Sequence, residues 1–218
     1  MSIRQSILKF FYPVLMLAGK IFGVRSDVIE NRNTVQPVSS FYDLTATAAD
    51  GTVIDFNRFK GTHVLIVNTA SDCGYTNQLS ALEKLHRLYK EKLMIIGFPS
   101  NDFKEQEKLS DNAIASFCMA NFGVTFLIVK KSFVVKGDRQ NHVFDWLSNK
   151  KKNGWNDKAP EWNFSKYLVN KKGILTHYFG PGVEPLSKAI TTALVLTCGL
   201  PRSFRKDIRK WLDSCTIL

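Results

Sequence analysis

The sequence predicts an α/β fold, and the segment 64–99 is the strongest evidence for it. Residues 64–67 form a short run of branched and aliphatic side chains, as in a strand that is buried on both faces. Apolar residues then recur at helical spacing between Leu79 and Tyr89, and a second apolar run follows at 93–99. A strand, a helix and a strand in this order predict a right-handed βαβ unit with two parallel strands.

A β-hairpin is expected ahead of this unit, because the segments 41–45 and 53–56 flank Asp50-Gly51, a dipeptide that favours a tight turn. Residues 25–39 are polar and lack periodicity, so they are expected to form a linker. The elements expected after the βαβ unit are, in order, a polar loop at 100–109, a helix from Ser110 to about Asn121, strands at 126–129 and 133–135, a helix from Asn141, a basic loop at 149–160, a hairpin of 167–169 with 174–178, and a helix at 186–196.

Cys73 lies in the turn between the first strand of the βαβ unit and its helix, for which Thr76 is the expected N-cap. Open α/β sheets place their chemistry at this edge. A thiol at a helix N-terminus is stabilised as the thiolate by free backbone N–H groups and the helix dipole. Asp72 acts in the opposite direction, because a neighbouring carboxylate raises the pKa of a thiol. These residues alone leave both a reactive thiol and a buried structural cysteine open.

The chain of 218 residues is long enough for one substantial core. It is strongly basic, with 30 Lys and Arg against 19 Asp and Glu. No zinc-ligand spacing, helix-turn-helix or aromatic-basic ribbon accompanies this charge, so a nucleic-acid partner is not favoured. An acidic protein or a membrane surface fits the charge better.

The two ends of the chain differ from its centre. Residues 1–24 are strongly apolar, but their uninterrupted run at 10–19 is short for a membrane span and contains Pro13. An interfacial helix is preferred, and a helix packed on the protein's own core or a secretory signal are the alternatives. Beyond residue 197, a basic tail carries one apolar face. We therefore divide the chain into an N-terminal apolar segment and linker (1–38), a folded domain (39–197) and a basic tail (198–218).

The four cysteines are too few and too widely spaced for a disulfide scaffold, and no pair has metal-ligand spacing; they are Cys73, Cys118, Cys198 and Cys215. This usage fits a reducing compartment with catalytic thiols. The sequence therefore predicts a cytoplasmic protein without a metal or cofactor, with membrane association possible through residues 1–24.

Several separate blocks of the sequence together resemble the glutathione peroxidase family. The blocks are Val67-Asn68-Thr69-Ala70-Ser71-Asp72-Cys73-Gly74-Tyr75-Thr76, Gly97-Phe98-Pro99-Ser100-Asn101-Asp102-Phe103, Gln106-Glu107, Asn121-Phe122-Gly123-Val124-Thr125-Phe126 and Trp162-Asn163-Phe164. They occur in the family's order and spacing. The resemblance implies a thioredoxin-like fold, in which helices flank a central mixed β-sheet and a hairpin is added at the N-terminus.

The resemblance also implies roles for individual residues. Cys73 occupies the place of the peroxidatic cysteine or selenocysteine, and Gln106, Trp162 and Asn163 complete the family's catalytic tetrad. An indole N–H and two amide groups can donate hydrogen bonds to a thiolate and to a departing peroxide oxygen. Without the resemblance, Trp162 would be read as core packing, Gln106 as a solvated loop residue and Asn163 as a local cap. Two departures from the family lie nearby, since Lys104 replaces a glycine and Leu127 a proline.

Cys118 matches the resolving cysteine of the cysteine-containing members that use thioredoxin, although a buried core thiol is the alternative. The segment 149–161 is short, which favours a monomer and thioredoxin over a glutathione-using tetramer. The implied function is a thiol peroxidase that reduces hydrogen peroxide and organic or lipid hydroperoxides. It would act through a Cys73 sulfenic acid and a Cys73–Cys118 disulfide that thioredoxin reduces. A glutathione-dependent peroxidase and a peroxide sensor or redox relay acting on a partner protein are the alternatives.

Overall fold

The computed structural model of the chain describes residues 27–90 and 92–196. The helices considered for residues 1–24 and for the basic tail lie outside the described residues. Within the described ranges, no helix is both long enough and apolar enough to cross a membrane.

A mixed six-stranded sheet forms the centre of the molecule, with the strand order β1-β8-β7-β4-β5-β6. The strands are β1 (Val28–Glu30), β4 (His63–Thr69), β5 (Leu93–Pro99), β6 (Leu127–Ile128), β7 (Lys166–Val169) and β8 (Leu175–Phe179). β4 pairs in parallel with β5 and antiparallel with β7, which confirms both the βαβ unit and the second hairpin. A separate two-stranded sheet of β2 (Thr45–Thr47) and β3 (Val53–Asp55) confirms the N-terminal hairpin.

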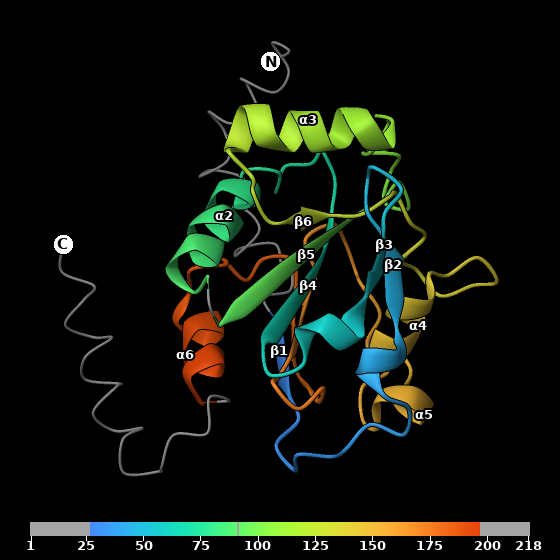
Figure 1. Ribbon diagram of the computed structural model, residues 1–218, viewed down its shortest axis with the longest axis vertical. Helices are drawn as coiled ribbons and strands as arrows, with labels where there is room; N and C mark the ends of the chain where they lie inside the picture. Colours follow the sequence, from blue (N-terminus) through green and yellow to red (C-terminus); the bar gives the residue numbers. More distant parts are fainter. Residues whose placement is uncertain (1–26, 91, 197–218) are drawn as a thin grey trace, which may run out of the picture.

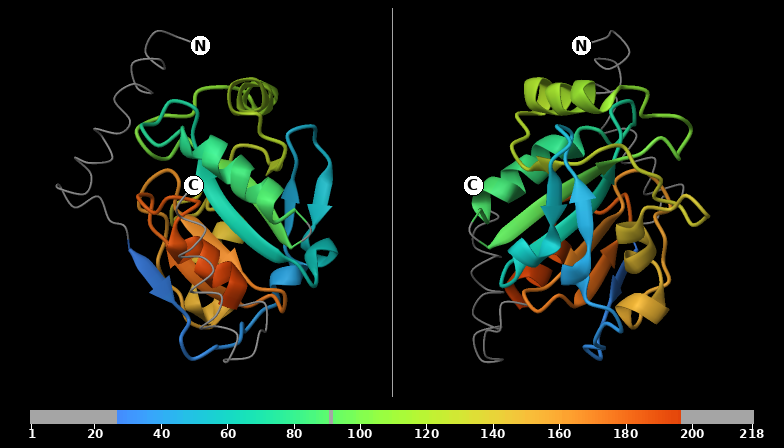
Figure 2. Two further views of the ribbon diagram at one scale, coloured as in Figure 1. Left: turned by 90° about the vertical axis from the view of Figure 1, so that its left-hand side faces the viewer. Right: turned by 45° about the vertical axis from the view of Figure 1, so that its right-hand side comes forward.

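Helices cover both faces of the sheet and one of its ends (Figure 1). They are α2 (Gln78–Leu88), α3 (Asp111–Phe122), α4 (His142–Leu147), α5 (Lys150–Asn153) and α6 (Lys188–Leu196). α2 and α6 lie on one side, and α4, α5 and the β2–β3 hairpin lie on the other. α3 lies across one end of the sheet in all views (Figure 2). This layered arrangement is the α/β class that the sequence predicts.

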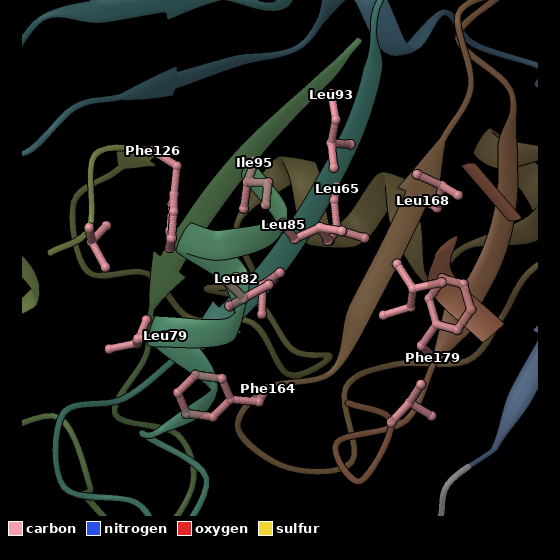
Figure 3. Packing of buried hydrophobic residues seen from close by; sticks show 14 of the residues in the cluster. Leu65, Leu79, Leu82, Leu85, Leu93, Ile95, Phe126, Phe164, Leu168 and Phe179 are labelled. Atoms are coloured by element: carbon pink, nitrogen blue, oxygen red, sulfur yellow. The ribbon is translucent and has the colours of Figure 1, made fainter. Parts of the chain in front are cut away.

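The two faces of β4 contact two different cores, because successive side chains of a strand point to opposite faces. Leu65 and Val67 belong to the cluster beneath α2, whereas Val64 and Ile66 belong to the cluster beneath α4 and the hairpin. Figure 3 shows the first cluster, in which leucines of α2 pack onto the strands. Burial of both faces explains why β4 is a continuous apolar run.

Four local predictions are wrong. The expected linker contains β1, which pairs with β8 as an edge strand. Phe41–Asp43 is a 3-10 helix, because Ser40 caps it and the Phe41 side chain is buried. Residues 133–135 form no strand, since the backbone N–H groups of Val134 and Val135 donate to Asp102. The expected loop at 149–160 contains the short helix α5.

Candidate active site

Cys73 lies in a tight turn after β4 and before α2, where the sequence places it. The hydroxyl of Thr76 closes this turn, accepting from the Cys73 N–H at 3.0 Å and lying 2.8 Å from the Cys73 carbonyl oxygen and 2.9 Å from that of Ala70. Because that hydroxyl is engaged in the turn, Thr76 is not the helix cap; Asn77 occupies the N-cap position. The thiol is therefore held one turn before the helix begins.

The loop that carries Gln106 is tied to the residues immediately before Cys73. The Glu107 carboxylate accepts hydrogen bonds from the backbone N–H and the hydroxyl of Ser71, each at 2.8 Å. The Gln106 carbonyl oxygen accepts from the Asp72 N–H at 3.0 Å. These three bonds fix the Gln106 loop beside the cysteine turn.

Trp162 and Asn163 lie in a turn that Asn68 of β4 holds in place. The Asn68 amide donates to the Trp162 carbonyl oxygen at 3.0 Å, and its side-chain oxygen accepts from the Ser165 N–H at 3.0 Å. The Asn68 backbone oxygen accepts from the N–H of Phe164, which adopts the left-handed region with a φ of 69°. A left-handed backbone at a residue other than glycine is strained and persists only where its surroundings determine it.

The structure brings all four predicted tetrad residues together. Asn163 is fully buried, and its amide donates to the Gln106 side-chain oxygen at 2.9 Å. The side chains of Asn163 and Trp162 face the sulfur of Cys73 closely enough to favour its thiolate, and so they act to lower the pKa of this thiol. Three distant parts of the chain therefore meet at one thiol.

Burial raises the pKa of the Cys73 thiol, against the expectation from its place before a helix. The opposing influences are the hydrogen bond from the Tyr75 N–H, at 3.4 Å from the sulfur, and the nearby donor groups of Asn163 and Trp162. Asp72 raises the pKa further, as expected, but is the smallest contribution. The donors stabilise the thiolate against the cost of its desolvation. Their position therefore decides how much thiolate forms.

Cys118 lies within α3 and is as buried as Cys73. Both thiols are free. Burial, with a smaller contribution from the charge of Glu107, raises the pKa of Cys118 to about 12. In this conformation Cys118 is a neutral core thiol.

Sequence reasoning assigned no role to several residues that shape the site. Asn68 and Glu107 lie within the sequence blocks shared with the family, and each is a buried polar residue with several hydrogen bonds. Phe103 packs against the Trp162 ring at 5.6 Å between centroids, and the Lys104 ammonium lies 5.7 Å from the same ring. Lys104 has a φ of 52°, the region that glycine favours, which agrees with the glycine expected there. A polar residue interrupting an apolar strand, as Asn68 does, was the available signal.

Among the described residues, no group of three or more His, Cys, Asp or Glu side chains could hold a metal ion.

Comparison with known proteins shows which family this site belongs to. The family model described as Glutathione peroxidase matches residues 41–148. The Schizosaccharomyces pombe protein named glutathione peroxidase-like peroxiredoxin gpx1 is 44% identical over 149 residues, covering 68% of this chain and 93% of that protein. Glutathione peroxidase-like peroxiredoxin 2 of Saccharomyces cerevisiae is 41% identical over 150 residues, covering 68% and 92%. The chain belongs to the glutathione peroxidase family.

Solved structures agree with this assignment. The crystal structure of Trgpx in apo form has a TM-score of 0.59 and 28% identity, covering 75% of this chain and 98% of its own. That of T. cruzi GPX1 has a TM-score of 0.52 and 30% identity, covering 72% and 97%. A thioredoxin-family thiol:disulfide interchange protein from Chlorobium tepidum shares the fold alone, with a TM-score of 0.51 and 12% identity over 73% and 97% of the two chains. The glutathione-peroxidase-family domain thus has a thioredoxin-like fold, and this member is a thiol peroxidase that reduces hydroperoxides.

Proposed function

We propose that Cys73 is the peroxidatic thiol of this peroxidase. The observation that carries the proposal is the convergence of the Asn163 and Trp162 side chains on the Cys73 sulfur. The Cys73 thiolate attacks the terminal oxygen of the hydroperoxide, and an S–O bond forms as the O–O bond breaks. The departing oxygen takes a proton and leaves as water or an alcohol, while the sulfur is oxidised to a sulfenic acid. Hydrogen peroxide and organic or lipid hydroperoxides are the proposed substrates.

The three other tetrad residues stabilise charge during this step. The Trp162 indole and the Asn163 amide donate hydrogen bonds to the thiolate and then to the departing oxygen. Gln106 accepts from Asn163 and so fixes the orientation of that amide. The Asn163 side-chain oxygen is buried and has no hydrogen-bond partner among the described residues. A hydroperoxide O–H is a suitable donor for it, since a buried polar atom is costly when it stays unpaired.

We propose Cys118 as the resolving thiol and thioredoxin as the reductant. The Cys118 sulfur attacks the Cys73 sulfenic acid, the disulfide forms and water leaves. A thioredoxin dithiol then reduces this disulfide by thiol–disulfide exchange. Support comes from the second buried thiol and from the short segment 149–161. The relatives named peroxiredoxins agree with it.

A coupled assay tests the reductant and separates the enzyme from a redox relay. Purified protein is supplied with peroxide, thioredoxin, thioredoxin reductase and NADPH, and in parallel with glutathione and glutathione reductase. Steady NADPH loss with thioredoxin supports the proposal. NADPH loss only in the glutathione assay would make glutathione the reductant. Consumption of a single equivalent of peroxide, with no steady NADPH loss in either assay, would indicate a relay to a partner protein.

We further propose a cytoplasmic monomer that contacts anionic membranes through its basic and apolar ends. The net charge of +11 and the apolar residues 1–24 support this. A deletion should stop at residue 26, because Val28–Glu30 forms β1 of the main sheet. Deletion of residues 1–26 should reduce binding to vesicles containing phosphatidylserine and leave activity on hydrogen peroxide unchanged. Equal vesicle binding by the shortened protein would contradict the contact.

A further inference from the structure

Lys166, the first residue of β7, is a fully buried lysine beside the candidate active site. Its side chain lies on the same face of β7 as Leu168, toward α2 and α6. Its ammonium donates to the carbonyl oxygens of Phe164 at 2.8 Å and Val183 at 2.7 Å, and more weakly to that of Pro181 at 3.4 Å. Fully buried lysines are rare, and a purely structural position would favour an apolar side chain.

The carbonyl groups that Lys166 binds belong to two turns. One is the turn at 162–165, where Phe164 directly follows Trp162 and Asn163 and has the strained φ of 69°. The other is the turn at 180–184, whose Pro181 carbonyl oxygen also accepts from the Gln78 amide at 2.8 Å. Gln78 is the first residue of α2, the helix that follows the Cys73 turn. A continuous set of hydrogen bonds therefore joins the cysteine side of the site to the Trp162–Asn163 side.

The chemistry of Lys166 fits a positioning role. An ammonium has three N–H donors and no acceptor, so it can pair with three carbonyl oxygens at once. A neutral amine has only two N–H donors, so it would leave one of the three carbonyl oxygens unpaired. Burial lowers the pKa of Lys166 to about 7, and the nearby charge of Glu184 opposes this shift. The three carbonyl acceptors likewise favour the charged form.

We propose that Lys166 and Gln78 are positioning residues that hold Trp162 and Asn163 in hydrogen-bonding range of the Cys73 sulfur through the turn at 180–184. The inference rests on the proposed role of Cys73 and deepens it. Neither residue contacts the thiol. Each side chain binds backbone carbonyl groups of the two turns. By holding these turns in place, it keeps the donor groups of Trp162 and Asn163 near the Cys73 sulfur. If the link is broken, the donors move away and the pKa of Cys73 rises.

The pKa of Cys73 is the direct test, because it needs no peroxidase turnover. The background is the full chain with Cys118→Ala, Cys198→Ser and Cys215→Ser, which leaves Cys73 as its one thiol. The rate of alkylation by iodoacetamide is measured against pH, with circular dichroism to check folding. Lys166→Met keeps the length of the side chain and removes its ammonium. We expect the pKa of Cys73 to rise by about one unit, and sulfenic acid formation with hydrogen peroxide to slow by roughly tenfold.

Thr176→Val is the matched control. Thr176 is buried in β8, and its hydroxyl donates to the Leu168 carbonyl oxygen at 3.0 Å, so this variant also removes a buried side-chain hydrogen bond to the backbone of β7. The same hydroxyl also lies 3.0 Å from the Nδ1 atom of His177, and within the described part of the chain neither contact involves the turns at 162–165 and 180–184. The pKa of Cys73 should stay at its starting value in Thr176→Val.

A double-mutant cycle separates positioning from a general loss of stability. Once Asn163→Ala and Trp162→Phe have removed the donors, Lys166→Met should have almost no further effect on the pKa. An equal additional shift in that background would overturn the proposal. Gln78→Met breaks the other end of the link and should also raise the pKa of Cys73. This variant tests the proposal if Lys166→Met does not fold. Folded variants with an unshifted pKa would also overturn it.

Failure of this inference and failure of the proposed function have different signatures. If Cys73 were not the peroxidatic thiol, peroxide would leave it unoxidised in the parent background, whatever residue stands at position 166. If only the positioning role were wrong, Cys73 would be oxidised at the same rate in the parent and in Lys166→Met.

Discussion

The turn around Cys73 and the helix around Cys118 carry equally buried thiols in opposite surroundings. The Cys73 sulfur accepts a hydrogen bond from the Tyr75 N–H, and the Trp162 indole and the Asn163 amide also act to lower the pKa of its thiol. For Cys118, burial and the nearby charge of Glu107 both raise the pKa of the thiol. The donor groups around the sulfur, rather than the degree of burial, therefore distinguish Cys73 from Cys118.

The two regions also differ in how firmly they are held. The cysteine turn is closed by Thr76 and tied to Glu107, whereas α3 buries only Ile114 and Cys118. The flanks of α3 are anchored better than its interior. The Asp111 carboxylate accepts from the Lys131 N–H at 2.7 Å, and Glu83 of α2 accepts from the N–H and hydroxyl of Thr125. Weakly packed segments open first, so we infer that α3 rearranges between two fixed ends when Cys118 reacts.

The largest expected effect comes from removing the prepared thiol. Cys73→Ser replaces a thiol by a hydroxyl, which does not form a nucleophilic anion near neutral pH. Peroxide reduction should fall by at least about a thousandfold while the circular dichroism spectrum is unchanged. Substantial turnover in this variant would remove Cys73 from the mechanism and with it the contrast between the two thiols.

Cys118→Ser should separate the two regions kinetically. The variant should reduce one equivalent of peroxide at the normal rate, because its Cys73 surroundings are intact, and then fail to cycle with thioredoxin. Stopped-flow peroxide consumption and the coupled NADPH assay measure these two steps. Full thioredoxin-dependent turnover would mean that Cys118 is only a core residue, and glutathione would become the preferred reductant.

The raised pKa of Cys118 predicts a loss of stability at high pH. The folded thiol keeps its proton to about pH 12, whereas the unfolded thiol loses it near its ordinary value of about 8.5. Above that pH the unfolded state binds fewer protons, so the free energy of unfolding falls as pH rises from about 8.5 to 12. At pH 10 the loss is about 2 kcal/mol.

Urea unfolding with a reductant present, at pH 7.5 and pH 10, measures this loss. Cys118→Ala should show a smaller decrease between the two pH values, because it lacks the titrating group. Titration of Cys73 lowers the free energy of unfolding of both proteins in the same way, so its contribution cancels in the comparison. An identical decrease in both would contradict the assigned environment of Cys118.

The smallest expected effect concerns the strength of α3. Asn112 and Ser116 are exposed in this helix, and both are poorer helix formers than alanine. Asn112→Ala with Ser116→Ala should stabilise α3 and slow formation of the Cys73–Cys118 disulfide by about twofold to fivefold. The first reaction with peroxide should keep its rate. Ser80→Ala on α2 is the control, and an equal slowing there would argue against local unwinding of α3.

The fold could largely be predicted, because its signals are local. The apolar run of β4, the spacing of leucines in α2 and the Asp50-Gly51 turn each determine their own element. The predictions that failed depended on distant partners. Val28–Glu30 becomes a strand only because β8 offers an edge, and residues 133–135 lose their strand pairing to the Asp102 carboxylate.

The sequence by itself determined the family and the place of Cys73 between a strand and a helix, and it predicted the three residues that accompany this thiol, Gln106, Trp162 and Asn163. Those properties depend on residue types and their order along the chain. The tertiary structure alone decided that burial raises the pKa of Cys73 while three donors oppose it, and that Cys118 is a buried, neutral thiol within α3. It also decided that Asn68 and Lys166 hold the Trp162–Asn163 turn. The physical reason is that a pKa and a hydrogen bond depend on distances between groups that only folding brings together.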